Sequence, residues 1–249
     1  MSQLKLSLLV CALGATMWAQ SSKSTPTPSA APASGQVAAE PAAAAFKPTT
    51  DDLLADVQMS IRGDHQVGMV WWIPFEFWEV SDESGKAAEA VKGLRDYTVI
   101  AVVTGRVGPF GNITYQPAEK VRASTFIRDS DGIEYAKLDK VPEDVEFLSQ
   151  VLQPVFTNAL GKMGENINLI FFPGKSKNGH RIDDPHGKGD FTVLLKNDIA
   201  GDGTHAFDFH LPLNSLAPPK YCPKGNERVQ ANWKYCPWHG VALTEEAKK

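Results

Sequence analysis

The spacing of hydrophobic positions along this chain predicts β-strands more often than helices. The stretch 97–107 (YTVIAVVTGRV) has an unbroken apolar centre, which is typical of a strand buried on both faces. A second apolar and aromatic run covers 67–80, and we expect it to form another strand. Shorter strands are predicted where apolar residues cluster or alternate later in the chain, over 166–172, 190–196 and 205–211.

Alternation of side chains between positions 121 and 128 predicts one arm of a β-hairpin. The residues that would share one face are Val121, Ala123, Thr125 and Ile127. The next four residues (DSDG, 129–132) are typical of a turn, because Asp-Gly accepts the positive φ angles that tight turns need. Residues 133–138 are then predicted to return as the second arm.

Two segments show the 3.6-residue period of a helix. Between 82 and 95, apolar side chains recur at i, i+3, i+4 and i+7 from Ala87 to Leu94. Between 142 and 160 an apolar stripe is interrupted by Pro154, which predicts a kink or two consecutive helices. Roughly seven strands against two or three helices predict an α+β fold. We expect a largely antiparallel sheet or a β-sandwich with two or three helices, plus a small C-terminal ribbon-like tail.

The first twenty residues have the layout of an export signal. Lys5 precedes an apolar run over 6–15, which is shorter than the ~20 residues that a membrane span needs. We expect cleavage after Ala19 or Gln20, which places the protein in the periplasm or outside the cell, in association with the envelope. Two alternatives stay open: an uncleaved anchor, and lipidation at Cys11.

Composition divides the remaining chain into a tether, a main domain and a C-terminal segment. Residues 21–48 are rich in Ala, Ser, Thr and Pro, which predicts a disordered tether, and 49–220 are long enough for one sheet-rich domain. The formal charge of the whole chain is −4. No cluster of Lys or Arg stands out, so nucleic acid is not an expected partner. The mature chain also has no apolar stretch long enough to span a bilayer.

The C-terminal segment 221–243 contains two similar loops, YCPKG (221–225) and YCPWHG (235–240). They resemble the two CPxCG loops of a small zinc ribbon, which bind one tetrahedral zinc ion. Each loop keeps its first Cys and its Pro, but Gly225 and His239 stand where the second Cys is expected. The resemblance therefore implies at most three metal ligands: Cys222, Cys236 and His239.

Three hypotheses for this tail stay open. The first is a metal-free ribbon, held by packing of Trp233, Tyr235 and Trp238 on the main domain. The second is a Cys222–Cys236 disulfide, which export favours. The third is a three-ligand zinc site with water in the fourth position. In all three we expect the two cysteines to lie close together and the tail to dock on the main domain, because so short a segment cannot fold alone.

The combination of an export signal, one domain and this ending also resembles a group of exported bacterial proteins of unknown function. The segments that carry this resemblance are LPL and PPKYCP in 211–223 and YCPWHG in 235–240. It implies a shape for the tail but no reaction.

Two other groups of residues are candidates for a binding or catalytic site. His180, Asp183, Asp184, His186 and Asp190 lie in one loop, followed by His205, Asp208 and His210. Histidines and carboxylates at such spacing can bind metal or transfer protons, although the Gly- and Pro-rich composition favours an ordinary surface loop. The aromatic group is Trp71, Trp72, Phe75, Phe77 and Trp78. It could form a platform for sugars, although apolar residues on both faces favour a core strand.

These observations lead to one preferred function and two alternatives. We expect an exported, non-enzymatic binding or structural protein of the cell envelope, with an unknown envelope protein or glycan as partner. It would carry no cofactor or one structural zinc ion. The first alternative is an envelope enzyme or metal-binding protein that uses the polar loop between His180 and His210. The second is a carbohydrate-binding module that uses Trp71, Trp72 or Trp78.

Overall fold

A computed structural model of the protein describes residues 46–63 and 65–247. The predicted signal peptide and most of the predicted tether lie outside the described residues. The described part has an α+β fold in which every pair of neighbouring strands is antiparallel. The predicted fold class is therefore confirmed.

The first sheet is built around one long central strand. Strand β3 (Tyr97–Val107) coincides with the predicted buried strand, and its residues from Thr98 to Gly105 are all buried. It pairs with β2 along one edge and with β7 and β4 along the other, and β1 extends the sheet beyond β2. The bounds are β1 (Gln58–Gly63), β2 (Gln66–Trp72), β4 (Ile113–Tyr115) and β7 (Asn168–Pro173).

The second sheet has four strands in the order β6-β5-β8-β9. Their bounds are β5 (Thr125–Arg128), β6 (Glu134–Ala136), β8 (Gly189–Leu195) and β9 (His205–Leu211). The predicted hairpin turn joins β5 to β6, and Gly132 has a φ of 82° there, as the turn chemistry predicts.

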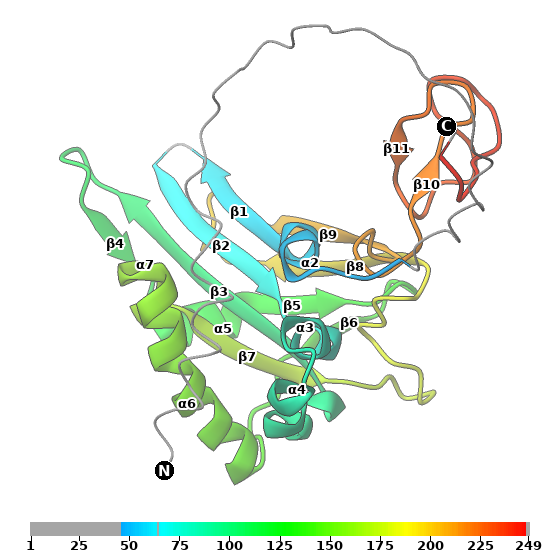
Figure 1. The fold of residues 1–249 in the computed structure, drawn as a ribbon. Helices are drawn as coiled ribbons and strands as arrows, with labels where there is room; N and C mark the ends of the chain where they lie inside the picture. Colours follow the sequence, from blue (N-terminus) through cyan, green and yellow to red (C-terminus); the bar gives the residue numbers. More distant parts are fainter. Residues whose placement is uncertain (1–45, 64, 248–249) are drawn as a thin grey trace, which may run out of the picture.

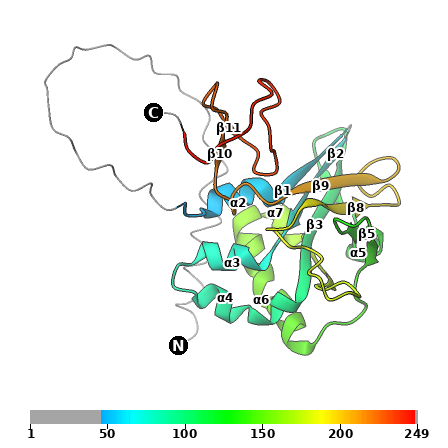
Figure 2. The ribbon, with the colours of Figure 1, turned by 90° about the vertical axis from the view of Figure 1, so that its right-hand side faces the viewer.

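Two adjacent tryptophans of β2 show how the layers pack. Trp72 faces the second sheet, where its ring centroid lies 4.7 Å from that of Phe191 and 5.4 Å from that of Phe209. Trp71 faces the other way and meets Phe77 and Phe156 edge-on, at 5.4 and 5.6 Å. Because successive side chains of a strand point to opposite faces, the first sheet lies between the second sheet and a helical layer (Figures 1 and 2).

The helices are more numerous and mostly shorter than the sequence predicts. Their bounds are α2 (Thr50–Val57), α3 (Phe75–Ser81), α4 (Lys86–Ala90), the 3₁₀-helix η1 (Lys92–Asp96), α5 (Ala118–Ser124), α6 (Glu143–Leu160) and α7 (Lys162–Glu165). The single helix predicted over 82–95 is divided into α4 and η1. Pro154 lies inside α6 without dividing it, and its ring is exposed to solvent.

Two strand predictions were too long. The strand predicted over 67–80 ends at Trp72, and Phe75–Ser81 form α3 after the N-cap Pro74. The strand predicted over 121–128 begins only at Thr125, because α5 follows the N-cap Pro117. In both cases a proline gives the chain a helix start, and the buried side chains then recur at helical spacing.

Candidate metal centre

The C-terminal tail is a separate small unit of paired strands and loops. Strands β10 (Lys220–Tyr221) and β11 (Arg228–Val229) pair antiparallel, and isolated bridges join Tyr221 to Thr244 and Tyr235 to Ala242. Figure 2 shows this unit beyond α2, away from the two large sheets. Asn214 connects it to the main domain, since its side-chain oxygen accepts a hydrogen bond from the Ala231 N–H at 2.7 Å.

The two cysteine loops have the same backbone geometry. Cys222 N–H donates to the Glu227 carbonyl at 3.0 Å, and Cys236 N–H donates to the Val241 carbonyl at 2.8 Å. In each loop the fourth residue after the cysteine donates back to the cysteine carbonyl, at 2.7 and 2.8 Å. These fourth residues, Asn226 and Gly240, both have a positive φ, of 59° and 63°. The repeated loop suggested by the sequence therefore exists in the fold.

The loops bring four potential metal ligands to one point. The ligand atoms of Cys222, Glu227, Cys236 and His239 all lie within 4.8 Å of one another, and this group could hold a metal ion. The His239 Nδ1 atom lies 3.2 Å from Cys222 Sγ and 3.4 Å from Cys236 Sγ. The prediction that the cysteines lie close together is confirmed. Both are fully buried free thiols in the structure.

Glu227 is a candidate ligand that the sequence pattern did not reveal. Its Oε1 lies 3.3 Å from His239 Nδ1 and 3.6 Å from Cys236 Sγ. The carboxylate occupies the space left by the absent side chain of Gly225, because a Cβ added at 225 would lie 1.9 Å from Glu227 Oε2. The carboxylate of Glu227 thus lies where the side chain of the second Cys is expected, although Glu227 is two residues further along the chain.

Four of the six separations between the candidate ligand atoms can be compared with the edges of a tetrahedron around zinc. With Zn–S bonds of about 2.3 Å and Zn–N or Zn–O bonds of about 2.0–2.1 Å, sulfur and nitrogen ligands lie about 3.5 Å apart. Nitrogen and oxygen ligands lie about 3.3 Å apart in the same geometry. These four separations, 3.2 to 3.6 Å, agree with the expected values to within a few tenths of an ångström, and all pairs of ligand atoms lie within 4.8 Å.

Two of these closely spaced side chains have shifted pKa values. Burial raises the pKa of the Cys236 thiol, and the neighbouring Cys222 thiol adds to this rise. The pKa of the Glu227 carboxyl is lowered, chiefly by a hydrogen bond from its own backbone N–H and less by the two thiols and His239. A cation would offset the cost of ionising two buried thiols at one place.

The metal-free hypothesis packs three tail aromatics on the main domain, but only Trp233 is half-buried and the other two are largely exposed. Tyr235 is 64% exposed and Trp238 is 67% exposed. Trp238 instead meets the ring of Trp233, with centroids 5.8 Å apart. The fully or mostly buried apolar residues of the tail are few: Cys222, Val229, Ala231 and Cys236.

The histidines and carboxylates of the polar loop do not form a comparable cluster. Within the residues that the structure describes, the tail group is the one set of three or more such side chains with metal-ligand proximity. His210 pairs with Asp190 at 2.7 Å on the exposed face of the second sheet, and Asp208 accepts a hydrogen bond from Thr192. His180 and His186 are exposed elsewhere.

Asp183 has a structural role in the core. It is 2% exposed, and its carboxylate accepts hydrogen bonds from the Trp72 indole N–H and the Arg181 Nε–H, both at 3.1 Å. Arg181 also makes a two-pronged ion pair with Glu76 of α3. Burial raises the pKa of Asp183 to about 6, against the opposing effect of Arg181. The network ties α3 and β2 to the loop before β8.

The aromatic group near position 75 is core and not a sugar platform. Trp71, Trp72 and Trp78 are 2%, 0% and 4% exposed. The exposure that a carbohydrate-binding module at these residues requires is therefore lacking.

Comparison with protein-family models, with curated proteins and with solved structures finds no match for this chain. In the part of the chain that the structure describes, none of the helices has the length and hydropathy needed to span a membrane.

Proposed function

We propose that this protein is an exported binding or structural protein of the cell envelope whose C-terminal tail is held together by one structural zinc ion. The observation that carries the proposal is the convergence of Cys222, Glu227, Cys236 and His239 at tetrahedral spacing. The ion would bind the two thiolates, one carboxylate oxygen and the Nδ1 atom of the imidazole.

Four protein ligands support a structural and not a catalytic role. Catalytic zinc sites keep one position for water or substrate, whereas structural sites are closed by four protein ligands. Glu227 supplies the fourth ligand, so that a water is not needed to complete the coordination. The histidines and carboxylates between His180 and His210 do not come together in one cluster, so they give no support to the enzyme alternative.

The small core of the tail supports a cross-link of some kind. Four mostly small buried side chains contribute little hydrophobic stabilisation, and segments of this size usually need a metal or a disulfide to hold their fold. In an oxidising compartment the two thiols would otherwise be open to disulfide formation. Zinc coordination keeps both as thiolates and also uses His239 and Glu227, which a disulfide would leave without a role.

Metal analysis and thiol counting on the purified mature protein, from which signal cleavage removes Cys11, test this proposal. We expect close to one zinc ion per chain, and we expect Cys222 and Cys236 to react with a thiol reagent only after denaturation with a chelator. Protein without zinc in which both cysteines react would instead be the metal-free ribbon, and protein without zinc or reactive thiols would be the disulfide form. Either result contradicts the proposal.

A matched pair of histidine variants adds a control. His239→Ala should lose zinc, because it removes one of the four ligands. His186→Ala changes an exposed histidine of the polar loop and should keep the wild-type zinc content.

A further inference from the structure

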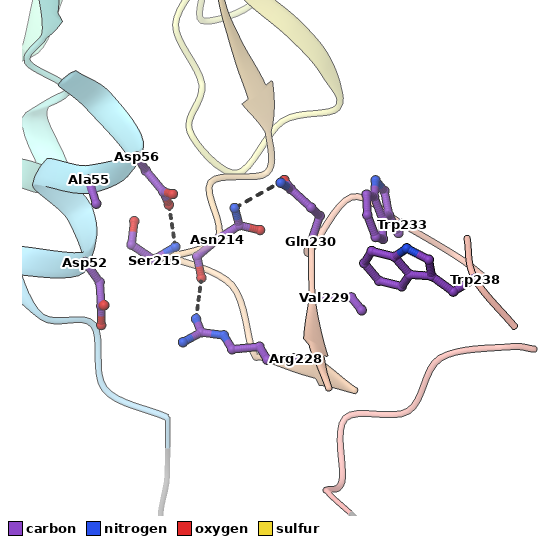
Figure 3. Close-up of a pocket in the computed structure, with 10 residues that line it drawn as sticks. All are labelled: Asp52, Ala55, Asp56, Asn214, Ser215, Arg228, Val229, Gln230, Trp233 and Trp238. Carbon is purple, nitrogen blue, oxygen red and sulfur yellow. Dashed lines mark hydrogen bonds between the residues drawn. The ribbon is translucent and has the colours of Figure 1, made fainter. Parts of the chain in front are cut away.

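A cleft with a volume of about 380 Å³ separates α2 from the C-terminal tail. Figure 3 shows its two walls, with Asp52 and Asp56 on α2 and the rings of Trp233 and Trp238 on the opposite side. Asn214 and Ser215 lie between them, and Ser215 N–H donates to Asp56 Oδ2 at 2.7 Å. The volume falls within the range of small-molecule sites, roughly 300–1,000 Å³.

The α2 wall offers hydrogen-bond acceptors. Asp52 and Asp56 are four residues apart and therefore lie on one face of the helix. One oxygen of Asp52 accepts from the Thr49 hydroxyl, and one oxygen of Asp56 accepts from Ser215. Within the described residues, the second oxygen of each carboxylate has no hydrogen-bond partner.

The tail wall offers donors. Arg228 makes one long hydrogen bond, to the Asn214 carbonyl at 3.5 Å, and it forms no ion pair with any residue that the structure describes. Gln230 also lines the cleft, and its Oε1 accepts from the Asn214 side chain at 3.3 Å. Its amide N–H₂ group has no acceptor in the described structure. The guanidinium and the carboxylates thus line the same cleft without pairing with each other.

These walls favour a ligand whose polar groups both donate and accept. A hydroxyl does both, whereas a carboxylate only accepts and a guanidinium only donates. A cationic ligand would meet the charge of Arg228, and an anionic ligand would meet two carboxylates. The indole face of Trp238 adds an amphipathic surface suited to the C–H face of a sugar ring.

We propose that the cleft between α2 and the tail binds a neutral saccharide. The ring of the sugar lies against Trp238, and its hydroxyls donate to Asp52 and Asp56 and accept from Arg228. This assignment differs from the sugar platform expected at Trp71, Trp72 and Trp78, which are buried.

The proposal rests on the metal-bound tail proposed above, because the tail wall is attached to the metal ligands. Arg228 directly follows Glu227, and Trp238 lies between Cys236 and His239. The coordination that fixes these ligands also fixes the positions of the two wall residues. Zinc binding and saccharide binding are therefore thermodynamically linked.

Calorimetric titration of the full-length protein with neutral mono- and disaccharides tests the cleft. The probes cover gluco, galacto, manno and N-acetylated configurations, and spermidine serves as the cationic comparator. We expect at least one saccharide to bind and Trp238→Ala to weaken its affinity about tenfold, the loss expected for one aromatic contact. The control is Tyr235→Ala, which removes an equally exposed tail aromatic that does not line the cleft and should leave the affinity within about twofold.

The zinc content of each sample separates the two proposals. Zinc-loaded protein that binds none of the saccharides, or that binds spermidine alone, overturns the saccharide assignment and leaves the metal proposal standing. Saccharide binding that is equally strong in Trp238→Ala also overturns it. Wild-type protein without zinc refutes the metal proposal, whatever the titration shows.

Discussion

Gly225→Ala should damage the metal centre although it adds only one methyl group. The new Cβ would lie 1.9 Å from Glu227 Oε2 and 2.7 Å from Glu227 Cδ. Real Cβ contacts essentially never fall below 3.0 Å, so the carboxylate must retreat by about 1.1 Å. Zinc–ligand distances tolerate about 0.2 Å. The candidate ligand atom, Glu227 Oε1, would itself lie 2.9 Å from the new Cβ, so we expect the shifted side chain to bind zinc less well.

The expected loss of zinc affinity is about 10- to 100-fold, or about 1.4–2.7 kcal/mol. This is the range typical of changes that disturb how a metal ligand is positioned. Competition with a chromophoric zinc chelator measures this change. The melting temperature in excess zinc should fall with it, because metal binding to the folded state contributes to stability.

Two further variants make the result specific. Lys224→Ala changes the exposed neighbour of Gly225 without adding an atom and should keep wild-type affinity. The double variant Gly225→Cys with Glu227→Ala restores a thiolate at the second-Cys position and should recover zinc binding. Its cobalt complex should show thiolate charge-transfer absorption for three sulfurs instead of two. If Gly225→Ala binds zinc as tightly as wild type, the reasoning that Glu227 needs the open space at position 225 is refuted.

Three other variants test the fold. Burial raises the pKa of Asp183 to about 6, so the protonated side chain stabilises the fold below about pH 4 and this contribution is lost as pH rises through 6. The unfolding free energy of wild type relative to Asp183→Asn should therefore grow by up to about 1.4 kcal/mol per pH unit as pH falls from 6 to 4. A difference that stays constant with pH in urea titrations would show that the pKa of Asp183 is ordinary. Gly132→Val places a β-branched residue at a φ of 82° and should cost about 1–3 kcal/mol, so an unchanged melting temperature would contradict the turn geometry. Phe156→Ala removes the ring that meets Trp71 and should cost about 3–5 kcal/mol in chemical denaturation, and a cost below about 1 kcal/mol would mean that α6 does not pack on the first sheet.

The sequence predicted well both a strand with two buried faces, β3, and a strand with one exposed face, β9. Strand β3 is buried on both sides, so its continuous apolar run marked its bounds correctly. The runs that were assigned too long, 67–80 and 121–128, each combine a short helix with a strand. A short apolar run fits either period, and the prolines at 74 and 117 were the local signal that a helix begins.

The candidate metal centre was predictable only in part, for a physical reason. Cys222, Cys236 and His239 stand at ligand positions of the zinc ribbon that the tail resembles, so the resemblance predicts their convergence. Glu227 has no such place, because its side chain must turn back over Gly225 to reach the other ligands. Only the three-dimensional path of the loop shows that an absent side chain at 225 and a long one at 227 are complementary.

The same complementarity gives the proposed site the charge balance of a zinc ribbon with three cysteines and one histidine. A ribbon with three cysteines and one histidine presents three anionic ligands and one neutral ligand to the ion. In the proposed zinc site Cys222, Cys236 and Glu227 would likewise supply three anions, and His239 would supply the neutral ligand. The carboxylate reaches the centre from position 227 because its side chain is longer than that of cysteine and Gly225 leaves the space open. Replacement of either residue alone breaks the arrangement, so positions 225 and 227 should behave as a coupled pair in a double-mutant cycle.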